Sequence, residues 1–188
     1  MKSVIAFTTI LGAAVAQEIA PPAGSFVLGA WSPGSGLPGS KINANGGSFW
    51  LGKDPSSSCP AVEGLDCTAF PGTRTVLVGG NDTLSLDVAV PGGQQVYVGP
   101  NGALGYTPPH SSYMPTGSVT TGFHRFRSQS GGAPVVMNFQ GNSFLACPDA
   151  TNSGVYQIFA HLVVTDGGNC TFFQMRTYTA EGINAWQY

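Results

Sequence analysis

Glycine-containing turns recur along the chain at nearly equal spacing, and each precedes a short apolar or aromatic run. The three matching segments are 46–52, 93–99 and 141–147, and their starts lie 47 and 48 residues apart. A repeated unit of this size cannot bury its apolar face alone and packs against its copies. The spacing therefore predicts one all-β domain with a trefoil-like, approximately threefold arrangement, and a two-sheet β-sandwich is the alternative.

The middle copy lies in segment 88–106, whose pattern is typical of a β-meander. One turn, Pro91-Gly92-Gly93, follows the apolar run ending at Val90, and a second turn at 99–102 follows the run ending at Val98. Proline presets the turn φ, glycine supplies positive φ, and Asn-Gly favours a tight hairpin. No stretch sustains an apolar period of 3.6, so almost no helix is expected.

Alternating and apolar runs predict the strands and the core. In 83–90 the even-numbered apolar residues share one face and Asp87 lies on the other. A fold-back at 79–82 separates this strand from its neighbour. The expected strands are 25–31, 48–52, 73–78, 83–90, 135–139, 144–146, 155–164 and 171–178. The residues expected to be buried are Leu28, Leu86, Val88, Val96, Val98, Phe144, Ile158 and Phe159.

The beginning of the chain indicates export. Lys2 precedes an apolar segment, and Ala14-Val15-Ala16 has the small-x-small pattern of a cleavage site. Residues 1–16 are therefore predicted to be a signal peptide, 17–24 a flexible lead-in, and 25–188 the all-β domain. The apolar segment is too short to span a bilayer. We expect a secreted, extracellular protein with no membrane partner.

Four cysteines in an exported chain predict two disulfides, for which three connectivities exist. We favour Cys59–Cys67 and Cys147–Cys170, because the first pair flanks a loop with no strand of its own, which a covalent clip would stabilise as a self-contained unit. Two Asn-x-Thr sequons, at Asn81 and Asn169, lie in turn-like contexts and predict a glycoprotein.

Residues that could support catalysis do not form a recognisable pattern. The three histidines, His110, His124 and His161, lie in different segments without metal-ligand spacing, so no metal or cofactor is expected. A copper-dependent polysaccharide enzyme would need histidine where Gln17 begins the mature chain. Without Lys2, six basic residues face nine acidic ones, which argues against nucleic acid. The acidic residues mostly adjoin turn formers, and no Gly-x-Ser-x-Gly motif exists. The sequence favours a non-enzyme, and a small secreted hydrolase is the least favoured class.

Aromatic residues are numerous enough to form a sugar-stacking platform. Trp50 and Tyr97 lie in the middle of expected strands and are interpreted as core residues. Tyr113, in the long loop 108–117, is the best candidate for glycan contact. The full set is Trp31, Trp50, Tyr97, Tyr106, Tyr113 and Trp186.

Five motifs resemble a fungal secreted family named after the cell-wall protein PhiA, whose members are often labelled IgE-binding proteins. The similarity runs in the same order over nearly the whole mature chain. It implies a wall-associated protein of conidium-forming cells, sometimes an allergen, and supplies no catalytic residues. The motifs occupy 90–98, 102–107, 144–148, 156–160 and 185–188.

Taken with this resemblance, the residues favour a structural or developmental protein of the cell wall. Its expected partner is a wall polysaccharide or a wall glycoprotein. A lectin-like glycan-binding module and a host-directed effector or allergen are the alternatives. Binding to isolated wall polymers would separate these classes from a hydrolase.

Overall fold

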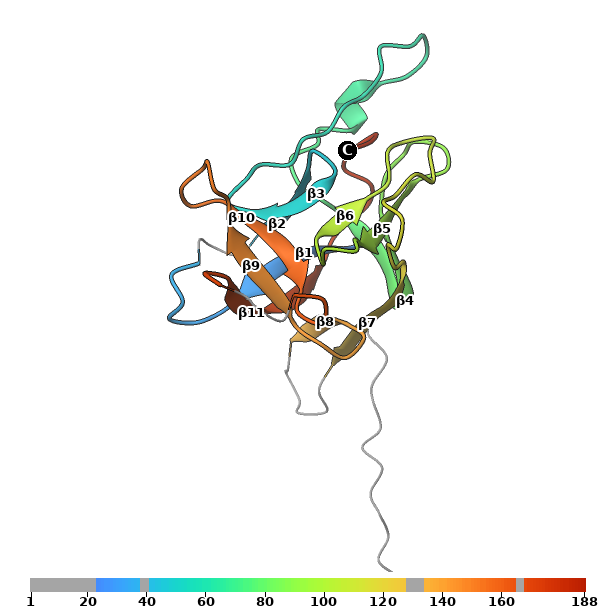
Figure 1. Ribbon diagram of the computed structural model, residues 1–188. Helices are drawn as coiled ribbons and strands as arrows, with labels where there is room; N and C mark the ends of the chain where they lie inside the picture. Colours follow the sequence, from blue (N-terminus) through green and yellow to red (C-terminus); the bar gives the residue numbers. More distant parts are fainter. Residues whose placement is uncertain (1–22, 38–40, 128–133, 165–167) are drawn as a thin grey trace, which may run out of the picture.

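The computed structural model describes residues 23–37, 41–127, 134–164 and 168–188, which form one antiparallel sheet of eleven strands (Figure 1). The expected signal peptide and most of the lead-in lie outside the described residues. Within these ranges the only helical element is one 3-10 turn, η1 (Cys67–Ala69), so the all-β prediction is confirmed. The strands are β1 (Phe26–Trp31), β2 (Lys41–Asn45), β3 (Ser48–Leu51), β4 (Leu77–Leu86), β5 (Gln94–Val98), β6 (Leu104–Tyr106), β7 (Thr121–Arg127), β8 (Val135–Phe139), β9 (Phe144–Pro148), β10 (Tyr156–Ala160) and β11 (Thr171–Thr179).

Extra strand pairings close the sheet into a barrel. The strand order is β1-β2-β3-β10-β9-β11-β8-β7-β4-β5-β6. β3 also pairs with β6 through Ser48 and Gly105, and β1 also pairs with β11 and β4. The expected copies 46–52, 93–99 and 141–147 coincide with the turns and strands at β3, β5 and β9. Trefoil-like threefold symmetry and the two-sheet alternative both stay predictions.

β4 folds back on itself. In a straight strand residues four apart are about 13 Å from each other, yet a Cβ atom on Gly79 would lie 2.5 Å from the Thr83 carbonyl oxygen. Asp82, between them, has a left-handed backbone with φ of 83°, and the Asp87 N–H donates to the Val76 carbonyl at 2.8 Å. The two strands expected around 79–82 are the arms of this bend.

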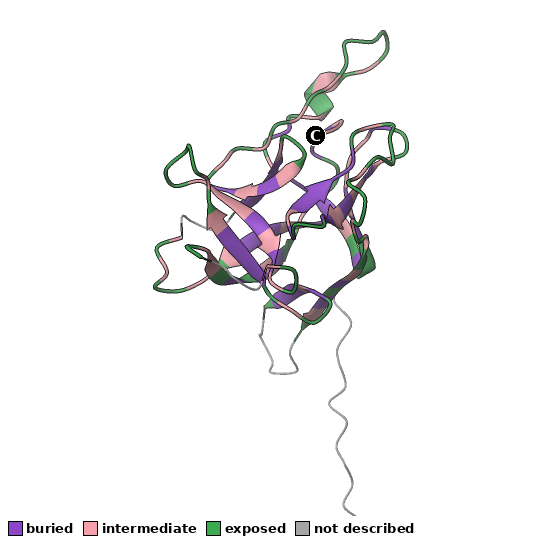
Figure 2. Cartoon of the chain, in the orientation of Figure 1, coloured by how far each residue is buried: buried purple, intermediate pink, exposed green. Residues whose placement is uncertain are grey.

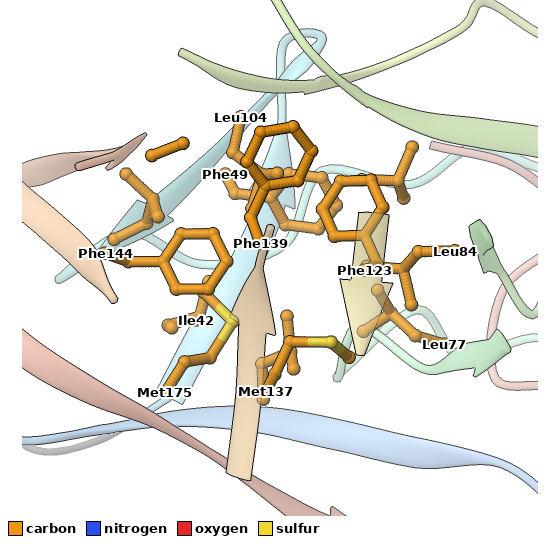
Figure 3. Packing of buried hydrophobic residues seen from close by; sticks show 14 of the residues in the cluster. Ile42, Phe49, Leu77, Leu84, Leu104, Phe123, Met137, Phe139, Phe144 and Met175 are labelled. Atoms are coloured by element: carbon orange, nitrogen blue, oxygen red, sulfur yellow. The ribbon is translucent and has the colours of Figure 1, made fainter. Parts of the chain in front are cut away.

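The apolar side chains of the strands meet inside the barrel (Figure 3). Phe123 and Phe139 pack at 5.0 Å between ring centroids, and Phe49 meets the edge of Tyr106 at 5.5 Å. Figure 2 shows this buried interior within a more exposed set of loops. Burying such rings removes roughly 150–250 Å² each from water and dominates the stability of a core. Of the eight residues expected in the core, six are buried: Leu28, Leu86, Val96, Val98, Phe144 and Ile158.

The other two expected core residues are only half-buried, for different reasons. β4 ends at Leu86, so Val88 lies beyond the strand that was expected to continue to residue 90. Ile158 and Ala160 point inward from β10, which places Phe159 on the outer side. β10 is also shorter than the expected 155–164, and β2, which was not expected, completes the sheet beside β1 and β3.

The segment that ends the chain is fastened to the barrel by hydrogen bonds. The Gln94 amide donates to the carbonyls of Thr107 and Tyr188 at 2.9 and 2.8 Å, and it accepts the Tyr188 N–H at 2.7 Å. The Tyr188 hydroxyl donates to the Arg74 carbonyl. The N–H of Val90 donates to the Trp186 carbonyl at 2.9 Å. Two motifs that carry the family resemblance, 90–98 and 185–188, are therefore bonded to each other.

Both expected disulfides are present. Cys147–Cys170 joins β9 to the approach to β11, with Cα atoms 4.1 Å apart. Cys59–Cys67, with Cα atoms 5.9 Å apart, lies in the 52–73 excursion that projects from the barrel in Figure 1. This excursion is less independent than expected, because Ser58 pairs with Gln187 at its base.

Candidate glycan-binding surface

Trp50 and Tyr97 lie on the outside of the barrel, and their interpretation as core residues is wrong. In β3 the buried residues are Phe49 and Leu51, so Trp50 between them faces outward and is half-buried. In β5 the residues on either side of Tyr97 are buried, and the tyrosine faces outward in the same way. The period of two in each strand contained this signal.

Gly105 provides the floor on which the Tyr97 ring lies. Tyr97 is directly opposite Gly105 on β6, and Gly105 is directly opposite Ser48 on β3. A Cβ atom on Gly105 would lie 2.8 Å from Cζ of Tyr97 and 2.9 Å from its hydroxyl oxygen. The ring therefore extends across β6 towards β3, and only glycine leaves room for it.

Polar side chains separate the two outward rings. Ser48, two residues before Trp50, accepts a hydrogen bond from the Gln157 amide at 3.3 Å, and Gln157 is the cross-strand partner of Trp50. From strand spacings, the Cα atoms of Trp50 and Tyr97 are about 12 Å apart along the sheet. We call Ser48, Trp50, Tyr97, Gly105 and Gln157 the outer aromatic face.

Trp50 is held in place from below and from one side. Its indole N–H donates to the Asn45 carbonyl at 2.9 Å, which fixes the ring plane. The Lys53 ammonium lies 4.4 Å from the ring centroid, a cation–π contact. Lys53 is positioned in turn by the Asn43 amide, which donates to its carbonyl at 2.9 Å. The ring is therefore preorganised, which reduces the entropy lost on binding a ligand.

Tyr113 is a surface residue, as its loop position predicted, and it is 71% exposed. Burial raises the pKa of Tyr97, and electrostatic interaction with Tyr113 raises it further, which places the two phenols in the same neighbourhood. The Ser111 hydroxyl accepts the Tyr113 N–H at 3.0 Å. Tyr113 is therefore an exposed ring in the neighbourhood of Tyr97.

A cavity of about 320 Å³ opens beside the same end of β3 and β6. The Tyr106 ring and hydroxyl form part of its wall, and that hydroxyl accepts the Gly47 N–H at 3.0 Å. Burial raises the Tyr106 pKa. The lining consists of small polar residues, two prolines and two tyrosines: Gly46, Gly47, Ser56, Ser57, Ser58, Tyr106, Pro108, Pro109 and Tyr188.

The remaining aromatic candidates lie elsewhere. Trp31 is 45% exposed, and the Arg176 guanidinium lies 3.9 Å from its ring centroid. It is at the end of β1 opposite Gln174 of β11, and β2 separates β1 from β3 in the sheet. Trp186 packs against the edge of Phe70 at 5.6 Å at the base of the excursion.

Comparison with known proteins assigns the chain to a family. The model of the PhiA-like secreted protein family matches residues 26–188. The chain belongs to the PhiA-like secreted proteins. It is 37% identical over 155 residues to a protein of Arthroderma benhamiae described as an uncharacterized secreted protein, covering 78% of this chain and 76% of that one. No solved structure matches it.

The PhiA-like chain is a secreted protein, as the sequence predicted. Within the described ranges, no helix is long and apolar enough to cross a membrane. The match begins at the first residue of β1 and includes every strand, so the outer aromatic face lies entirely within the family region.

Acidic and histidine side chains of the PhiA-like protein serve local structure where their contacts are defined. Asp149 accepts hydrogen bonds from Thr151 and Asn152, and these bonds lower its pKa to about 2. Asp87 accepts one from the Ser25 hydroxyl at 2.5 Å. His161 packs against the edge of Phe172 at 4.6 Å. In the described part of the chain, no three His, Cys, Asp or Glu side chains gather in a way that could hold a metal.

Both sequons of the PhiA-like protein are accessible. Asn81 is exposed at the fold-back of β4, directly opposite His124 of β7. Asn169 is exposed next to Cys170 and its disulfide. Neither side chain is buried, so a glycan at either site would project from the barrel without disturbing the core.

Proposed function

We propose that this PhiA-like protein is a non-enzymatic component of the fungal cell wall that is retained there by neutral polysaccharide. The observation that supports this most is the outer aromatic face, in which two fixed rings, on Cα atoms about 12 Å apart, flank a hydroxyl and an amide. Flat rings offer contact area at low entropic cost, and the polar groups can bond sugar hydroxyls. The side chains between the rings, Ser48 and Gln157, carry no charge, which suits a neutral sugar.

The biological role that goes with this binding is structural or developmental. The family resemblance suggests conidium-forming cells, and N-glycans at Asn81 and Asn169 would add further contacts within the wall. A trefoil-like arrangement would suit the proposal, since it presents the outer side of the sheet on a rigid body. Allergenicity or an effector role would be secondary properties of such an exposed, stable protein.

A pull-down of the purified mature protein against chitin, β-glucan and mannan tests the binding. Replacing Trp50 or Tyr97 with alanine should weaken retention on the bound polymer at least about fivefold, the effect of losing roughly 1 kcal/mol. Tyr113→Ala should have a smaller effect in the same direction. Trp31→Ala is the matched control, because it removes an exposed ring outside the outer aromatic face, and its retention should equal the wild type.

Two outcomes would contradict the proposal. Equal loss of retention in Trp31→Ala and Trp50→Ala would indicate non-specific binding through any exposed ring, provided that both variants keep the wild-type melting temperature. Hydrolysis of any of the three polymers would move the protein to the enzyme class.

Its role in the organism is tested separately. The mature protein should be found partly in the wall fraction and partly in the medium, and deletion of its gene should impair conidiation. Normal conidiation with a lost hydrolytic activity would overturn the developmental role.

A further inference from the structure

A second cavity, of about 200 Å³, lies where β1 and β2 separate. The two strands pair only at Leu28–Ile42 and Gly29–Lys41. Beyond these two pairs, β2 is bonded to Thr75 instead, whose hydroxyl accepts the Ala44 N–H at 2.8 Å. The lining residues are Val27, Leu28, Lys41, Ile42, Asn43, Arg74, Thr75, Thr179 and Ala180.

The two charged residues that line this cavity are both positive. Lys41 and Arg74 line it and no acidic residue does, although the whole chain has only seven basic residues against nine acidic ones. Neither cation forms an ion pair with a described residue, and a guanidinium stays charged at every physiological pH. A site with two cations and no counter-charge attracts an anion.

Arg74 is fixed in position with hydrogen-bonding capacity to spare. Its N–H donates to Asn184 Oδ1 at 2.9 Å, and its Nη2 donates to the Glu181 carbonyl at 2.7 Å. Its Nε is buried and has no hydrogen-bond partner in the described chain. A guanidinium carries five N–H donors, and Nη2 has an acceptor here, so further N–H groups of Arg74 remain for a ligand oxygen.

Of the other lining residues, Val27, Leu28, Ile42 and Ala180 have apolar side chains, and Asn43, Thr75 and Thr179 have polar ones. Val27 and Ala180 are only half-buried and offer hydrocarbon to a ligand. A bare inorganic anion would leave this surface without a partner, whereas an organic acid could bury its hydrocarbon part there. We propose that this cavity binds a small carboxylic acid with an apolar body, the carboxylate lying with Arg74 and Lys41 and the body against β1 and β2.

The test is a titration of the full mature protein with benzoate, followed by amide chemical shifts and by calorimetry at low salt. Benzoate should saturate with shifts centred on β1 and β2, and benzamide, which has the same shape without the charge, should bind at least about tenfold more weakly. Lys41→Gln and Arg74→Gln should each weaken benzoate several-fold or more. Lys53→Gln and Arg176→Gln remove cations that do not line the cavity and should leave the affinity unchanged.

The design separates the proposal from a folding defect. Lys41 is exposed, so Lys41→Gln should keep the wild-type melting temperature even if Arg74→Gln does not. Equal binding of benzoate and benzamide, or equal effects of Lys41→Gln and Lys53→Gln, would overturn the carboxylate site. Inorganic sulfate competing as strongly as benzoate would show that the apolar wall contributes nothing and would also overturn it.

Discussion

Replacing Gln94 with leucine should destabilise the protein without enlarging or emptying the core, because the two side chains have similar volumes. Gln94 is 1% exposed and makes three hydrogen bonds, two of them to Tyr188. Each contributes about 1 kcal/mol net, and the Thr107 carbonyl, in a residue that is 2% exposed, would lose its bond from Gln94. The expected loss in the free energy of unfolding is about 3 kcal/mol.

Urea denaturation followed by tryptophan fluorescence measures this difference. Gln95→Leu is the matched control, because Gln95 is half-buried on the opposite side of β5 and its side-chain amide forms no hydrogen bond within the described residues. It should change stability by less than about 0.5 kcal/mol. A loss below about 1 kcal/mol for Gln94→Leu, or an equal loss for both variants, would refute the argument.

The variant Gln94→Glu should make the free energy of unfolding depend on pH in a way that the wild type does not. The new carboxylate would face the carbonyl oxygens of Thr107 and Tyr188, so burial and repulsion should raise its pKa in the folded state above the usual value of about 4.3. The group is then neutral in both states below pH 4, and the unfolded state alone ionises as the pH rises. Relative to wild type, Gln94→Glu should therefore be least destabilised in acid and lose further stability towards neutral pH. A difference from wild type that does not vary with pH would contradict this placement of the amide.

Four other measurements address separate parts of the structure. Gly105→Ala should displace the Tyr97 ring and weaken polysaccharide retention as Tyr97→Ala does, while costing only about 1–2 kcal/mol of stability; unchanged retention would separate the ring from the binding face. Phe144→Ala should cost about 3–5 kcal/mol in the same urea assay, since the side chain is fully buried; a change near zero would contradict its core position. Burial raises the Tyr188 pKa to about 12. Between pH 10 and 12 the phenol ionises in the unfolded state first, so the free energy of unfolding should fall as the pH rises. In Tyr188→Phe this fall should be smaller by roughly 2 kcal/mol, after allowance for partial exposure. Secreted from a fungal host, Asn81→Gln should lose one glycan by intact mass, and an unchanged mass would show that this sequon is not used.

The period of two along a strand predicts which side chains face inward, even where residue type suggests the opposite. Val96 and Val98 face inward, so the same period places Gln94 inside and Tyr97 outside. Residue type suggested the opposite for both, because glutamine is usually exposed and tyrosine is often buried. Here position within the strand prevails over residue type, and both the buried amide and the outer aromatic face follow from it.

Long-range pairing could not be read from the chain in the same way. The strand β2 has the sequence Lys-Ile-Asn-Ala-Asn, which has little β-branched or aromatic content to indicate it. Its existence depends on partners in β1 and β3 and on the residue 75 hydroxyl. The Cys59–Cys67 disulfide was predictable because loop length and the lack of an expected strand between its cysteines are local properties, and with four cysteines this choice leaves Cys147–Cys170. The cavity at Arg74 was not, since its walls come from four separate parts of the sequence.

The pairing of β1 with β11 determines when this chain can fold. Val27 pairs with Tyr178, and all six residues of β1 have partners in β11. Ribosomes add about 5–20 residues per second, so the first strand is made roughly 7–30 s before its main partner. During that interval the apolar side of β1 has no complete sheet to cover it, and contacts so distant in sequence form slowly. The barrel therefore cannot close until β11 has been made, long after β1.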